Sequence, residues 1–132
     1  MASDNVELLR QAVEAINGRD AERLIGLVAD DFEWITPVMS GEPRIYKGRE
    51  GIHEFMREAS AFERFEARIE ELRDLGDRAL MLGEVKRSSD PEEQASTLAT
   101  VIYLADGRIT RIQTYRSANE AWTAAGLGRP RP

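Results

Sequence analysis

The 132-residue chain contains no cysteine and a single histidine, His53. The missing cysteines exclude disulfides, nucleophilic thiolates and zinc sites built on thiolate, and they favour a cytoplasmic location. One imidazole with carboxylates is a poor ligand set for a transition metal. We therefore expect neither a metal nor another cofactor.

Long hydrophobic runs and an excess of basic residues are also missing. No run of about 18 apolar residues occurs, so we expect no transmembrane helix, and the first residues do not read as a signal peptide. Asp and Glu outnumber Lys and Arg by 24 to 18, which gives a net charge of −6. An acidic protein repels phosphate groups, so neither nucleic acid nor a membrane is an expected partner. The basic Arg-Pro-Arg-Pro end is short, and residues 128–132 are expected to form a flexible tail.

The hydrophobic content of 42% is enough for one core, so we expect a single domain over residues 1–132. In the first half of the chain, apolar residues recur mainly at helical spacing; from about residue 64 the period falls to two. The spacing predicts helices at 4–17, 20–31, 48–60 and from 117 to 126, strands at 32–36, 64–74, 79–86, 96–104 and 109–116, and a loop at 38–47.

The predicted order places most helices before a run of meandering strands. This order excludes a doubly wound parallel sheet, in which strands and helices alternate along the chain. Asp106-Gly107, between two predicted strands, is a strong signal for a two-residue hairpin. We expect an α+β, cone-shaped fold. Its curved antiparallel sheet of four to six strands would carry helices packed on the concave face around a pocket.

Three stretches resemble the nuclear transport factor 2-like superfamily, and within it the SnoaL-like polyketide cyclases and ketosteroid isomerases. The first is residues 15–20, which read Ala-Ile-Asn-Gly-Arg-Asp. The second runs through 27–38 and 48–55, and the third through 106–115. The resemblance implies a small-molecule pocket. It does not imply one reaction, because this superfamily contains enzymes, binding modules and transport adaptors.

The catalytic groups of these relatives are replaced here. The ketosteroid isomerase pattern implies a carboxylate base, a tyrosine donor and a protonated acid at the positions of Thr36, Ala12 and Thr100. We therefore expect no double-bond migration in a keto steroid. The acid that SnoaL-like cyclases carry after the last strand is also missing, because that stretch reads Tyr115-Arg116-Ser117. Limonene epoxide hydrolase, another relative, uses an arginine with two Asp, and no inward Asp is found on 96–104.

Strand alternation and the resemblance together direct one set of side chains into the pocket. This set is Ile16, Trp34, Thr36, Phe55, Met81, Leu98, Thr100, Ile102, Ile112, Thr114 and Arg116. Trp34 is expected to be either a core residue or a platform on which a ligand stacks. Thr36 and Thr100 are expected either to have a structural role or to contact a ligand. An inward Arg116 needs an anion: an internal acid such as Glu33 or Glu84, or a ligand carboxylate or enolate.

Two functional readings follow. The first is an enzyme of the cyclase, isomerase or hydrolase kind that acts on an apolar, polyketide- or terpenoid-like metabolite. Arg116 would stabilise an oxyanion, and Glu33, His53 or a water held by the threonines would serve as base. The alternative is a non-catalytic binding or oligomerisation module. An apolar stripe on the convex sheet face is expected to form a two-fold homodimer. Its residues are Ala99, Val101, Tyr103, Gln113 and Tyr115.

Overall fold

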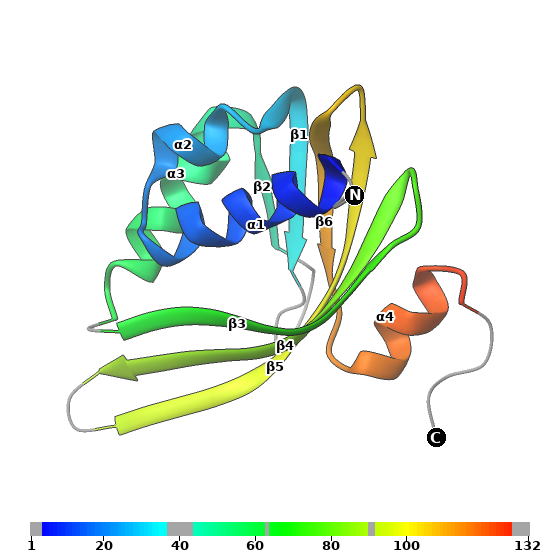
Figure 1. The fold of residues 1–132 in the computed structure, drawn as a ribbon. Coiled ribbons are helices and arrows are strands. Elements are labelled where there is room, and N and C mark those ends of the chain that lie inside the picture. Colours follow the sequence, from blue (N-terminus) through cyan, green and yellow to red (C-terminus); the bar gives the residue numbers. More distant parts are fainter. Residues whose placement is uncertain (1–3, 37–43, 63, 90–91, 128–132) are drawn as a thin grey trace.

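The computed structural model describes residues 4–36, 44–62, 64–89 and 92–127, and these ranges contain four helices and six strands (Figure 1). In chain order the elements are α1 (Asp4–Asn17), α2 (Ala21–Ile25), β1 (Val28–Thr36), β2 (Arg44–Lys47), α3 (Gly48–Ala59), β3 (Arg64–Asp74), β4 (Arg78–Ser89), β5 (Glu92–Ala105), β6 (Arg108–Thr114) and α4 (Ala118–Ala124). The predicted α+β class is confirmed. The expected tail at 128–132 and most of the expected loop at 38–47 lie outside the described residues.

The strands form one curved sheet in the order β2-β1-β6-β5-β4-β3. Four of the five neighbouring pairs are antiparallel, but β1 and β6 run parallel, with Trp34 opposite Ile112. The expectation of a wholly antiparallel sheet is therefore wrong at this pair. A parallel neighbour needs a long crossover, and the chain from β2 to β5 supplies one, which brings β6 back beside β1.

The second predicted helix is shorter than expected. The side chain of Asp20 caps α2 by accepting a hydrogen bond from the Arg23 amide at 3.1 Å, but the helix ends at Ile25. Val28, which was predicted to be helical, instead opens β1 opposite Ile109. This segment is a strand because it pairs with β6, which lies far along the chain, and the local apolar spacing does not indicate that pairing.

Residues 44–47 form a strand where a loop was expected. In β2 the side chain of Tyr46 is buried, whereas Ile45 is 48% exposed. Tyr46 lies opposite Trp34 in the ladder with β1. The turn into α3 is tight: a Cβ on Gly51 would lie 2.5 Å from the carbonyl carbon of Tyr46.

The sheet bends where β3 and β4 shift register between Ile69 and Glu71. At this bulge the backbones approach so closely that a Cβ on Gly83 would lie 1.9 Å from the Arg68 carbonyl oxygen. A glycine facing a bulge allows the ladder to curve, which creates the concave face. The Asp106-Gly107 hairpin is confirmed, with φ values of +53° and +73° that suit a type I′ turn.

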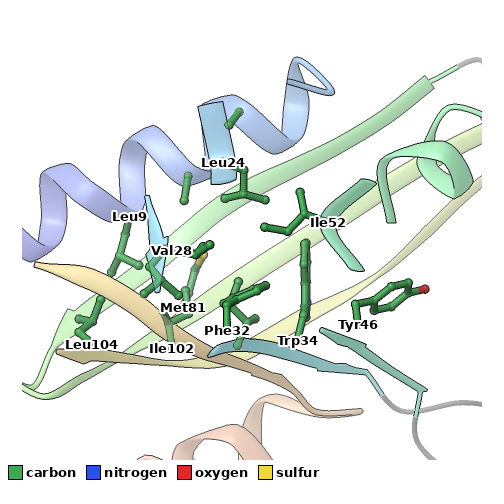
Figure 2. Packing of buried hydrophobic residues seen from close by; sticks show 14 of the residues in the cluster. Leu9, Leu24, Val28, Phe32, Trp34, Tyr46, Ile52, Met81, Ile102 and Leu104 are labelled. Atoms are coloured by element: carbon green, nitrogen blue, oxygen red, sulfur yellow. The ribbon is translucent and has the colours of Figure 1, made fainter. Parts of the chain in front are cut away.

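Helices α1, α2 and α3 cover the concave face, and the main core lies between them and the sheet (Figure 1). Figure 2 shows Leu9 of α1 and Ile52 of α3 directed toward Phe32, Trp34 and Met81 of the strands. Leu9, Ile52 and Phe32 are at most 1% exposed. Burial of each such side chain contributes about 2 kcal/mol to folding.

Helix α4 lies on the opposite, convex face (Figure 1). Its Ala121 packs with Ala99 and Val101 in a second apolar cluster, in which all three are buried. The expectation that the helices pack on the concave face is therefore wrong for α4. It also removes Ala99 and Val101 from the stripe expected to form a dimer, because the chain covers them itself. Tyr103, Gln113 and Tyr115 remain half-buried.

None of the described helices has the length and apolar character needed to cross a membrane.

Candidate functional site

A cavity of about 580 Å³ opens between α1, α3 and the concave face of the sheet. It is lined by Ala12, Val13, Ile16, Trp34, Thr36, Phe55, Phe65, Ala67, Met81, Val85, Arg87, Ser96, Thr97, Leu98, Thr100, Ile102, Ile112, Thr114, Tyr115 and Arg116. All eleven side chains expected to face the pocket are in this lining. That the cavity holds a ligand stays a prediction.

Aromatic rings form one wall of the cavity. The ring of Trp34 on β1 stacks on that of Phe55 on α3, with centroids 3.9 Å apart and an interplanar angle of 27°. Phe65 of β3 meets Phe55 edge to face, with centroids 5.9 Å apart. Trp34 is 7% exposed and also belongs to the core cluster. Trp34 therefore packs in the core, which was one of the two alternatives, and it also forms part of the cavity wall; its use as a ligand platform stays a prediction.

The threonines supply hydroxyls inside this apolar wall. Thr36, at the end of β1, donates a hydrogen bond of 3.4 Å to the Arg44 carbonyl of β2. Thr100 on β5 is 3% exposed, and its buried Oγ1 has no hydrogen-bond partner among the residues described. A buried hydroxyl without a partner costs folding free energy, and a ligand or a water in the cavity would remove that cost.

Two arginines belong to the lining. Arg116 follows the end of β6 and is exposed, so it lies at the mouth of the cavity rather than at its floor. Glu33 neighbours the inward Phe32 and Trp34 on β1, and Glu84 neighbours the inward Val85 on β4, so both alternate to the other face of the sheet. An ion pair inside the cavity between Arg116 and either glutamate, one of the alternatives left open, is therefore not supported.

Arg87 was missed by the sequence reasoning. It shares the face of Met81 and Val85 on β4, and it is half-buried. The predicted strand ended at Lys86, whereas β4 runs three residues further, to Ser89. Strand alternation continued by one step from Val85 would have directed Arg87 inward.

The two candidate bases are outside the lining. Glu33 pairs through the backbone with Lys47 and Arg111 and lies on the sheet face away from the cavity. His53 is on α3, with Nε2 3.5 Å from the Glu22 carboxylate, and its side chain is 44% exposed. Among the described residues, the lining contains no Asp, Glu, His, Lys or Cys.

A polar cluster fastens β2 to α3 beside the aromatic wall. The Tyr46 hydroxyl donates a hydrogen bond of 2.5 Å to Glu58, and Arg44 forms ion pairs with Glu54 and Glu58. Burial, followed by the bond to Glu58, raises the pKa of Tyr46 well above its ordinary value. In the cavity lining, burial likewise raises the pKa of Tyr115, with a smaller contribution from Tyr103. Neither phenol is a base at neutral pH.

No cluster of three or more carboxylate or imidazole groups close enough to hold a metal ion occurs within the described ranges.

Residues 9–112 match the model of the SnoaL-like domain. Among solved structures, an NTF2-like protein of unknown function from Burkholderia pseudomallei is 19% identical, with 92% of this chain and 96% of that chain covered and a TM-score of 0.76. TerC, co-crystallised with polyporic acid, is 21% identical over 95% and 96%, with a TM-score of 0.75. An LEH-like epoxide hydrolase from M. tuberculosis is 16% identical over 91% and 83%, with a TM-score of 0.69. No curated protein matches the sequence.

Proposed function

The chain belongs to the SnoaL-like domain family of the NTF2-like superfamily, and from this premise we propose that its cavity binds a small apolar molecule with a planar part. One observation carries the proposal: the lining is mostly apolar, with an aromatic wall and a few hydroxyls. A volume of about 580 Å³ is within the range of small-molecule sites.

We favour the hypothesis that the cavity binds its ligand without transferring a proton to or from it. General acid–base catalysis needs a group that exchanges a proton near neutral pH within reach of the substrate. The described lining offers hydroxyls, a phenol and guanidinium groups instead. The positions that carry the base, donor and acid in the ketosteroid isomerase pattern are Thr36, Ala12 and Thr100, and all three line the cavity.

The ligand class we propose is an apolar metabolite of polyketide or terpenoid type. Two proteins of the same fold agree with it: TerC was crystallised with polyporic acid, and the M. tuberculosis protein is described as an epoxide hydrolase. Stacked rings such as Trp34 and Phe55 present large, rigid apolar surfaces that suit a flat ligand.

Cavity filling tests the proposal. Ala67 is on β3 and lines the cavity, so Ala67→Phe would occupy the space with a ring. Ala95 is exposed on β5 and is absent from the lining, so Ala95→Phe adds the same ring outside it. We expect calorimetric titration with naphthamide, a neutral planar probe, to detect binding by the parent protein and by Ala95→Phe, and to detect none by Ala67→Phe. Equal affinity in all three would refute the proposed site.

A catalytic role is the second candidate, and the unpartnered Thr100 hydroxyl favours it. A water bound at the Thr100 hydroxyl could add to a strained ring such as an epoxide, the proton of the water passing to the oxygen of the opened ring, with Arg116 at the mouth stabilising the oxyanion as it develops. Turnover of an apolar epoxide that disappears in Thr100→Val would support this reading. Absence of turnover by a protein that binds naphthamide would leave the binding reading in place.

Homodimerisation through the convex face also stays a proposal. After α4 covers part of that face, the patch that remains contains Tyr103 and Gln113, with Tyr115 at its edge, because Tyr115 also belongs to the cavity lining. Arg111 lies with its guanidinium 5.6 Å from the Tyr103 ring centroid. We expect Tyr103→Glu to convert a dimer into a monomer in sedimentation; a parent protein that is monomeric at micromolar concentration would contradict the proposal. The cytoplasmic location also stays a prediction.

A further inference from the structure

Arg87 is a charged group facing an apolar cavity. It is half-buried on β4, directly opposite Phe65 of β3, and both residues line the cavity. Its Nη2 donates a hydrogen bond of 3.2 Å to the Ser96 hydroxyl, and its guanidinium lies 5.8 Å from the Phe62 ring centroid. Its Nε is buried and has no hydrogen-bond partner in the described part of the chain.

The described contacts of Arg87 include no anion. Among the side chains that the structure describes, which do not include those of residues 89–94, no carboxylate forms an ion pair with Arg87, and the cavity lining contains no Asp or Glu. A guanidinium cannot lose its charge by deprotonation in a protein. A half-buried cation whose contacts are a neutral hydroxyl and an aromatic ring gains free energy when a negative group arrives.

The geometry of the Ser96 hydroxyl completes a binding pair. Its oxygen accepts the bond from Arg87, so its own hydrogen is available to donate to another acceptor. The aromatic wall extends to Arg87, because Phe55 contacts both Trp34 and Phe65, and Phe65 lies opposite Arg87. A flat apolar body along this wall would therefore have one end beside Arg87.

We propose that the ligand of this cavity is an amphipathic anion, an apolar planar molecule with a carboxylate or comparable acidic oxygen group that Arg87 and Ser96 bind. This inference rests on the proposed function and specifies its ligand class. It assigns the anionic group to Arg87, a residue of the sheet, and leaves Arg116 at the mouth as a secondary contact.

A pair of probes with one ring system tests the inference: naphthoate, which carries a carboxylate, and naphthamide, which is neutral. Calorimetric titration at near-physiological salt is expected to show tighter binding of naphthoate. A hydrogen bond to a charged group is worth about 1.5–3 kcal/mol, so Arg87→Gln should weaken naphthoate binding roughly ten- to hundredfold. The same change should alter naphthamide binding less than about threefold, since the aromatic wall is unchanged. Ser96→Ala should weaken naphthoate selectively and to a smaller extent.

Arg64→Gln is the matched control. Arg64 is at the same end of the sheet, in an exposed position next to Phe65, and its loss changes the net charge equally. Screening at this salt confines the effect of a distant charge, so we expect naphthoate affinity to be unchanged in this variant. Thermal unfolding of each variant verifies that it folds, and Arg87→Lys, which keeps a cation, should retain part of the preference for naphthoate.

The outcomes separate the two proposals. Naphthamide binding without a preference for naphthoate, or equal losses for both probes in Arg87→Gln, would overturn the anion site and leave the apolar cavity standing. Equal loss of naphthoate affinity in Arg64→Gln would also overturn it, because the effect would then be one of net charge. No binding of either probe would overturn both proposals.

Discussion

The indole of Trp34 lies stacked on the ring of Phe55, with centroids 3.9 Å apart, and this contact joins strand β1 to helix α3. The same two rings face the cavity. One contact therefore both holds the helix on the sheet and shapes the wall that a ligand would meet.

Replacement of Phe55 by Ala should lower the free energy of unfolding by about 2 kcal/mol. The value is below the usual loss for a fully buried Phe, because Phe55 is only half-buried. Chemical denaturation followed by circular dichroism measures it. Ile45→Ala, which truncates an exposed side chain on β2, should change stability by less than about 0.5 kcal/mol. Similar losses in the two variants would show that the stack contributes nothing specific.

Two threonines on neighbouring strands offer a second comparison. The Thr100 hydroxyl is buried without a described partner, whereas Thr110 donates a hydrogen bond of 3.2 Å to the Tyr103 carbonyl. Thr100→Val should therefore raise the free energy of unfolding by about 1 kcal/mol, and Thr110→Val should lower it by about 1 kcal/mol. Denaturant titration of both variants tests this. A clear loss of stability in Thr100→Val would mean that its hydroxyl is satisfied in solution, for example by a bound water.

The bend of the sheet depends on Gly83. A methyl group there would meet the Arg68 carbonyl oxygen at 1.9 Å, so Gly83→Ala must open the β3–β4 ladder and should cost about 3 kcal/mol or more. At Gly26, which has helical backbone angles, an added Cβ would lie 3.4 Å from the nearest backbone oxygen. Gly26→Ala should leave the melting temperature unchanged or slightly higher. Equal melting temperatures for the two variants would contradict the close approach.

The raised pKa of Tyr46 predicts loss of stability at alkaline pH. Above about pH 10 an unfolded tyrosine loses its proton, whereas buried Tyr46, bonded to Glu58, keeps it. The unfolded state then binds fewer protons, so the stabilisation present below pH 10 falls as pH rises toward the folded pKa. Tyr46→Phe should be less stable at neutral pH, and its stability should decline less steeply above pH 10. Parallel stability curves for both proteins would refute this.

Strand alternation predicted the cavity lining better than it predicted the elements themselves. Trp34 and Thr36 on β1, and Leu98 and Thr100 on β5, are directed to one face by a rule that needs only a correct strand and one anchor residue. The family resemblance supplied that anchor. The rule missed Arg87 because the predicted strand ended at Lys86, and it was not applied to Ala67 and Val85, which line the cavity from within the predicted strands.

The remaining errors have long-range causes. Val28 looked helical because its neighbours Leu24 and Leu27 follow helical spacing, but it pairs with Ile109. Ala99 and Val101 were expected on an uncovered part of the convex face because Val101 alternates outward, and the final helix was not expected to fold over them. Local periodicity contains neither the strand partner of a segment nor the face on which a helix docks.

Met81 and Met56 allow the most direct test of the central claim, that the cavity binds a planar apolar molecule. Met81 lines the cavity, whereas Met56 is buried in the same core and is absent from the lining. In a protein labelled with ¹³C at its methionine methyl groups, titration with naphthoate should shift the Met81 signal through the ring current of the probe. The Met56 signal should stay nearly in place. The methyl signals are assigned with single Met→Leu variants. If no signal shifts at saturating probe, or if only the Met56 signal shifts, the account is contradicted.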